Sequence, residues 1–92
     1  MTVYVDDMQA PFRGMRMCHM LADTTEELHA MADMIGIERR FVQYPGTVKE
    51  HYDVPLPRRQ LAVSAGAVEV TWRFMGELVR ERRSAAMLGK CA

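Results

Sequence analysis

The chain has 92 residues, and its 12 basic and 12 acidic side chains cancel. This composition favours one small domain and excludes a general electrostatic attraction to nucleic acid or to an anionic membrane. The N-terminus lacks the basic and apolar regions of a signal peptide, and no apolar run is long enough to span a bilayer. Cys18 and Cys91 are far apart and form no C-x-x-C motif, so we expect two free thiols in a cytoplasmic protein with no membrane partner.

The N-terminal third predicts two strands. Residues 2–5 are β-branched or aromatic and are followed by Asp6 and Asp7, which end a strand; residues 8–14 contain Pro11 and Gly14 and predict a loop. Residues 15–22 have the two-residue period of a strand. One face of that strand carries Met15, Met17, His19 and Leu21, and the other carries Arg16, Cys18 and Met20.

The clearest element of the sequence is a helix over residues 24–35. Thr24 with Glu27, and Asp23 with Glu26, have the spacing of a capping box, which satisfies free N–H groups at a helix start. Helical spacing then places four apolar residues on one buried face: Leu28, Met31, Ala32 and Ile35. Gly36 suits the position that follows a helix end.

Weaker patterns follow. Residues 37–43 predict a third strand, joined to the second through the helix by a parallel, right-handed crossover. Residues 44–56 have no clear period, a second helix is expected from Pro57 to Gly66, and residues 67–70 form a fourth short strand. Thr71 caps a third helix, and residues 84–92 form a frayed tail.

These elements predict the fold class. We expect a single α/β domain over residues 1–92 with a small mixed sheet of about four strands and two or three helices, in the order β-β-α-β-α-β-α.

A polar set suggests a site for a divalent metal ion or for acid–base catalysis. Its members are imidazoles and carboxylates, namely His19, His51, Asp53, Asp6 and Asp7. His51 and Asp53 are two residues apart, so an extended segment directs both to one side. Of these five residues, His19, His51 and Asp53 are the candidates for catalysis.

Each member also has a structural interpretation. His19 could be a core-edge histidine bonded to the backbone or to Asp53, Asp6 with Asp7 could simply end a strand, and the His51–Asp53 loop could be anchored by its own hydrogen bonds. If the third strand follows a parallel crossover, Asp6 and Asp7 are expected at one end of the sheet and His51 and Asp53 at the other. These two pairs then meet only if the long loop folds back or if the first strand is parallel. His19 is the residue that either pair can reach.

The basic residues suggest a ligand. Arg58 and Arg59 follow the polar set at a helix start, where N–H groups favour anions, so we expect them, with Tyr52, to bind a phosphate-containing ligand. The arginines near residues 80–83 could contact nucleic acid, or they could form a solvated helix face. The last helix is apolar over a wide arc, so it either closes the core or pairs two chains in a homodimer.

Short motifs resemble a known family. Tyr4-Val5-Asp6-Asp7-Met8, Met17-Cys18-His19-Met20, His51-Tyr52-Asp53 and Gly66-Ala67-Val68-Glu69-Val70-Thr71 occur in that order. Together they resemble a family of small bacterial and phage proteins, the domain of unknown function 4031 family, over the chain as far as about Arg73. The resemblance implies no activity, cofactor or catalytic residue.

Two functions therefore remain open. The first is binding, with or without hydrolysis, of a phosphate-containing small molecule or nucleic-acid end at the His/Asp site, with a divalent metal as the candidate cofactor. The second is a non-catalytic interaction module. It would use a methionine-rich surface, since the chain has nine methionines, and the basic tail of its C-terminal third. The sequence does not decide whether the chain is an enzyme.

Overall fold

The computed structural model describes residues 1–91 and the side chains as far as residue 88. It contains five strands, three α-helices and one 3-10 helix, in the order β1 (Val3–Val5), β2 (Ala10–Phe12), β3 (Met15–Ala22), α1 (Thr25–Met34), η1 (Arg39–Phe41), β4 (Tyr52–Pro55), α2 (Leu56–Ser64), β5 (Val68–Glu69) and α3 (Trp72–Cys91). The α/β class and the mixed sheet are confirmed, with one strand more than the sequence predicted.

The longest strand, β3, organises the sheet. Along one side of it lie β1 and β2, both antiparallel to β3 and each paired with a different half of it, and β4 lies antiparallel on its other side. Beyond β1, β5 adds a parallel edge. The hairpin from β2 to β3 turns through Arg13 and Gly14, whose φ angles of 50° and 77° suit the tight turn that matches the twist of two strands.

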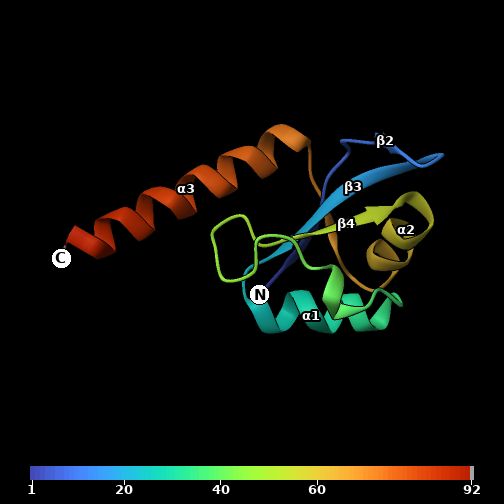
Figure 1. Cartoon of the computed structure of the whole chain (residues 1–92), viewed down its shortest axis with the longest axis horizontal. Coiled ribbons are helices and arrows are strands. Elements are labelled where there is room, and N and C mark those ends of the chain that lie inside the picture. The colour runs from blue at the N-terminus through green and yellow to red at the C-terminus, as the bar shows by residue number, and fades with distance from the viewer. Residues whose placement is uncertain (92) are drawn as a thin grey trace.

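The core lies between the sheet and two helices. In Figure 1, α1 and α2 lie below the sheet, and α3 leaves from above it. The buried face predicted for α1 is confirmed, since Leu28, Met31, Ala32 and Ile35 are all buried. The predicted cap is confirmed too, because the Glu27 N–H donates to Thr24 Oγ1 at 3.2 Å. Cys18 is a buried free thiol, whereas the side chain of Cys91 lies outside the described residues.

The predicted third strand is wrong. Residues 37–43 contain η1 instead, and in this segment Gln43 alone pairs with an extended neighbour, in an isolated bridge to His51. The place beside β3 is taken by β4, which lies in the stretch expected to be irregular, and β4 is antiparallel, so the expected parallel crossover is wrong as well. Arg39 helps to hold η1 against α1 by an ion pair of 2.8 Å with Asp33.

The predicted loop before β3 also contains a strand. Pro11 lies within β2, where it is tolerated because β2 is an edge strand and loses no hydrogen bond on its open side.

The last helix, α3, extends away from the rest of the molecule (Figure 1). Thr71 caps it as predicted, because the Phe74 N–H donates to Thr71 Oγ1 at 3.1 Å. The helix continues to Cys91 and so covers most of the segment for which the sequence predicted fraying. Within the described residues, no helix has both the length and the apolar character needed to cross a membrane.

Candidate functional site

His19 is the centre of the site because it lies on the central strand. Side chains alternate along β3, so the buried Cys18 and Met20 face the core while His19 faces the opposite side of the sheet. On β4, Asp53 lies directly across from His19. On the other side, Asp6 follows β1 and donates its backbone N–H to the His19 carbonyl oxygen at 3.0 Å. Strand pairing therefore brings one acidic residue to each side of His19.

Asp6 is fully buried, and three donors surround its carboxylate. Oδ1 accepts from the backbone N–H groups of His19 at 2.8 Å and Met8 at 3.2 Å, and Oδ2 lies 2.7 Å from His19 Nδ1. Burial by itself raises the pKa of Asp6, but these hydrogen bonds outweigh burial, so the pKa lies below its ordinary value. The same bond to Asp6 raises the pKa of His19 against the opposing effect of desolvation.

The bond between His19 Nδ1 and Asp6 Oδ2 determines which nitrogen of His19 is free. An ionised carboxylate only accepts hydrogen bonds, so Nδ1 of His19 carries the hydrogen that Asp6 accepts. In the neutral imidazole, Nε2 then has the lone pair and is the atom available to a ligand. Carboxylates commonly orient metal-binding histidines in this way.

The second half of the site comes from the residues around the start of β4. His51 Nδ1 lies 2.6 Å from the Lys49 carbonyl oxygen, which can only accept, so Nδ1 of His51 also carries a hydrogen. His51 Nε2 lies 3.3 Å from Asp53 Oδ1. The contact with His51 lowers the pKa of Asp53 below its ordinary value, so Asp53 is ionised near neutral pH.

The two halves converge at His19. The rings of His19 and His51 lie edge to face with 5.2 Å between their centroids. One ligand atom from each of His19, His51 and Asp53 lies within 4.8 Å of the others. The long loop does not have to fold back across the sheet, because β4 is antiparallel to β3 and places Asp53 beside His19 directly.

Two imidazoles and one carboxylate are a common set of ligands for Zn²⁺ and related divalent ions. Bonds of about 2 Å in a tetrahedral site place ligand atoms roughly 3.3 Å apart. His51 and Asp53 already have that spacing, at 3.3 Å. All three ligand atoms lie within 4.8 Å of one another, so movements of these side chains would bring the set to that spacing. Three protein ligands leave further coordination positions open, which is typical of catalytic sites and not of structural ones.

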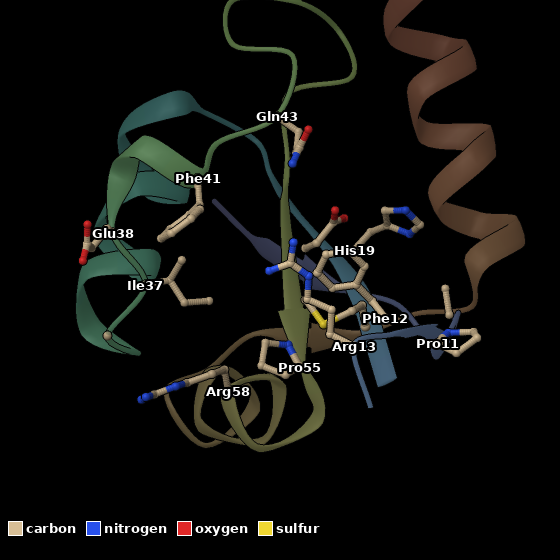
Figure 2. A pocket seen from close by; sticks show the side chains of 14 residues that line it. Pro11, Phe12, Arg13, His19, Ile37, Glu38, Phe41, Gln43, Pro55 and Arg58 are labelled. Carbon is tan, nitrogen blue, oxygen red and sulfur yellow. The ribbon is translucent and has the colours of Figure 1, made fainter. Parts of the chain in front are cut away.

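A cavity of about 760 Å³ opens beside His19 and Asp53. Figure 2 shows that its walls come from the β2–β3 hairpin on one side and from η1 on the other, with β4 between them. Phe12 and Arg13 line the first wall, and Phe41 lines the second. A cavity of this volume accommodates a small organic ligand next to the three candidate metal ligands.

A second cavity of about 330 Å³ reaches the same histidines from the direction of α3. Trp72 and Met75 of α3 contribute to its mainly apolar walls, and its polar lining includes His19 and His51. His19 lines both cavities.

Three residues predicted for the site have other contacts. Asp7 accepts from the backbone N–H of Trp72 at 2.8 Å and so helps to cap α3. Tyr52 is fully buried on the core side of β4, with its hydroxyl 2.6 Å from a ring nitrogen of His29. Arg59 donates to the Asp6 carbonyl oxygen at 2.7 Å and pairs with Glu69 at 2.9 Å.

Arg58 has an intermediate position. It lines the large cavity and donates to the Ile35 carbonyl oxygen at 2.9 Å, at the end of α1. Figure 2 shows it at the far end of the cavity from His19.

Sequence reasoning did not identify Phe12, Arg13, Phe41 and Gln43, which also line the cavity. A signal was present, because Phe12-Arg13 and Arg40-Phe41 each join an aromatic residue to an arginine in segments with no apolar period. The pairing of Asp6 with His19 was not identified either, since it depends on how β1 aligns with β3.

Comparison with known proteins identifies a family but no activity. No curated protein and no solved structure matches the sequence. The model of one family, described as protein of unknown function (DUF4031), matches residues 3–84, a range that includes His19, His51, Asp53 and Asp6. The match covers most of the chain, and the protein therefore belongs to the DUF4031 family.

Proposed function

We propose that this protein binds a divalent transition-metal ion through His19, His51 and Asp53, and uses it to bind and hydrolyse a phosphate-containing small molecule or a nucleic-acid end. Asp6 holds His19 in the required orientation. The free Cys18 thiol suits the reducing conditions of the cytoplasm, where we place the protein.

One observation carries this proposal. Both histidines have Nδ1 bonded to an acceptor, Asp6 for His19 and the Lys49 carbonyl for His51. When the rings are neutral, each therefore has its lone pair on Nε2 and no hydrogen there to donate, while one ligand atom from each histidine and the Asp53 carboxylate lie within 4.8 Å of one another. His51 Nε2 and Asp53 Oδ1, 3.3 Å apart, need either a proton or a cation between them. A metal ion satisfies all three acceptors at once, whereas a proton on His51 satisfies only one pair.

The surroundings favour a phosphate as the ligand of that ion. The cavity beside the site is open, and Arg13 and Arg58 line it. Arg13 forms no ion pair with any carboxylate in the described part of the chain, so its guanidinium is available to an anion. A bound divalent ion would supply Lewis-acid activation of the phosphate and of an attacking water. The carboxylate oxygen of Asp53 that does not hold the ion would accept the proton that this water loses.

Metal binding by the wild-type protein and by two histidine variants tests the proposal. We expect the purified protein to bind Zn²⁺ or Mn²⁺ stoichiometrically in isothermal titration calorimetry, and to melt at a higher temperature when the ion is present. His51→Ala should abolish this binding and leave the fold intact, because His51 lies at the edge of the sheet and outside the hydrophobic core. His29→Ala is the matched control, since His29 contacts Tyr52 and lies away from the site.

The outcome that contradicts the proposal is also clear. If wild-type protein and His51→Ala show the same weak response to both ions, the contact between His51 and Asp53 is an ordinary salt bridge. If His51→Ala destabilises the protein as much as a core truncation does, the pair of His51 and Asp53 is structural as well.

A second candidate function is supported by α3. This helix extends from the body (Figure 1), and Met87 and Leu88 near its end are 62% and 72% exposed. Apolar side chains on a protruding helix suit contact with another protein, including a second copy of this chain. Light scattering across a concentration series tests this use of α3: a dimer that Met87→Glu dissociates supports it, and a monomer at all concentrations rejects the homodimer.

A further inference from the structure

The large cavity carries aromatic and cationic side chains that metal binding does not require. Phe12 and Phe41 line it, and each is 52% exposed. An arginine covers one face of each ring: the Arg13 guanidinium carbon lies 5.1 Å from the Phe12 centroid, and that of Arg40 lies 4.4 Å from the Phe41 centroid. Core packing explains neither ring, because η1 has no buried residue and Phe12 is on an edge strand.

We infer that this cavity binds the nucleoside 5′-phosphate unit of a nucleotide, with the phosphate at the His19–His51–Asp53 site and the base against the rings of Phe12 and Phe41. The inference rests on the proposed function, since it takes the bound ion as the anchor of the phosphate. Proteins hold bases by stacking them on exposed aromatic rings and arginine planes, and such stacking accepts any base.

The size of the cavity agrees with this ligand. Its volume of about 760 Å³ is far larger than a phosphate ion needs and falls within the range of sites for small organic molecules. His19 is at one part of the wall, and Phe12 and Phe41 lie on opposite sides of β4 (Figure 2). A ligand that contacts both the ion and one of these rings would combine an anionic end with a planar end.

The charges along the cavity fit the two ends of a nucleotide. Arg13 reaches across the opening in the direction of Gln43 (Figure 2), where it can pair with a phosphate oxygen. Glu38 is the carboxylate nearest to Phe41 along the chain, and its ion pair of 2.6 Å with Arg40 compensates its charge. The Gln43 side-chain amide makes no hydrogen bond within the described residues, so it can bond to a base edge or a ribose hydroxyl.

Calorimetry with three probes tests the inference on Mn²⁺-loaded protein. AMP contains base and phosphate, ribose 5-phosphate lacks the base, and inorganic phosphate lacks both base and ribose. We expect AMP to bind at least roughly tenfold more tightly than ribose 5-phosphate, in line with the usual contribution of one stacked base. Phe41→Ala and Phe12→Ala should each reduce or remove this preference, with affinity for ribose 5-phosphate unchanged.

The matched control is Phe74→Ala. Phe74 is an exposed phenylalanine of α3 outside this cavity, so its loss should change neither affinity. Equal affinity of wild-type protein for AMP and ribose 5-phosphate would overturn the inference and leave the proposed function standing. Failure of the wild-type protein to bind Mn²⁺ or Zn²⁺ at all would overturn both.

A 5′-phosphorylated dinucleotide distinguishes the two sources of the ligand. Tighter binding of the dinucleotide than of AMP would identify the end of a strand as the ligand, and equal binding would identify a free nucleotide. Both results support the inference, because the recognised unit is the same. Binding of an unphosphorylated dinucleotide as tightly as the phosphorylated one would contradict it.

Discussion

Replacement of Asp6 by Asn tests how far the site depends on a residue that does not itself bind the ion. Asn has the same shape as Asp, and its oxygen can still accept from the backbone N–H groups of His19 and Met8 that now bond to Oδ1 at 2.8 and 3.2 Å. The third bond changes, because the amide NH₂ of Asn can only donate to His19 Nδ1. The hydrogen of His19 then moves to Nε2, which removes the lone pair that a metal needs.

The effects of Asp6→Asn on stability and on metal affinity follow from general magnitudes for these bonds. A hydrogen bond to a charged group contributes about 1.5–3 kcal/mol, so its replacement by a neutral bond costs part of this amount, and relief from burying the Asp6 charge offsets part of the cost. We therefore expect unfolding free energy to fall by about 1–2 kcal/mol, which lowers the Tm by roughly 5–15 °C. Metal affinity should fall by a larger factor, about 10–100-fold, as is usual when the carboxylate behind a histidine ligand is lost.

Zn²⁺ titration by calorimetry, together with thermal denaturation of the metal-free protein, measures both quantities. Asp7→Asn is the matched control, because Asp7 is the next residue and caps α3, a role that Asn performs equally well. If Asp6→Asn binds Zn²⁺ as tightly as the wild-type protein, the buried pair does not orient His19 as a ligand, and the argument from its tautomer fails.

As the pH rises above 6.5, the stability of the metal-free protein and its affinity for Zn²⁺ should change in opposite directions. The raised pKa of His19 contributes stability that is complete below its ordinary value of 6.5 and is lost as the pH rises through the folded pKa; the lowered pKa of Asp6 contributes stability above its ordinary value of 3.8. Chemical denaturation of the metal-free protein should thus show lower stability above pH 6.5, while Zn²⁺ affinity should increase over the same range. For the core, Leu28→Ala should cost about 2–5 kcal/mol in urea denaturation because Leu28 is only 1% exposed. Leu88→Ala, at a position that is 72% exposed, should change stability by less than about 0.5 kcal/mol; equal effects of the two would contradict the assigned core.

The elements predicted correctly are those with local signals. The start of α1 is determined by Thr24 and Glu27, which are neighbours on one turn, and its buried face by a helical period. The alternation in β3 is likewise a property of consecutive residues, and it correctly separated Cys18 from His19. No partner from a distant part of the chain is needed to recognise either pattern.

The elements predicted wrongly are those whose conformation depends on a partner. Phe41 and Val42 have strand propensity, but another segment pairs with β3, and η1 forms instead. That other segment, β4, is short and ends in Pro55, so its local signal is poor. Strand propensity describes a residue that fits a half-buried sheet, and the sequence does not show which segment will find the open edge.

The candidate site shows the same division. The spacing of His51 and Asp53 correctly predicted that they share a side, because that depends only on an extended backbone. Their meeting with His19 depended on β4 being antiparallel to β3, which the sequence did not reveal. The structural interpretation of His19 offered the backbone or Asp53 as its partner, whereas the ring bonds to Asp6 at 2.7 Å. Arg59, expected to face a ligand, instead donates to a backbone carbonyl because α2 begins close to the end of β1.

The burial of Tyr52 determines how β4 aligns with β3 when the folding chain assembles this site. If β4 slid by one residue along β3, His51 and Asp53 would turn into the core and Tyr52 would turn out to solvent. Two titratable side chains would then occupy the space of a fully buried aromatic ring, and its hydroxyl would lose its bond to His29. The mispaired sheet is therefore strongly disfavoured. Tyr52, which is not part of the site, thus fixes the strand register on which the site depends.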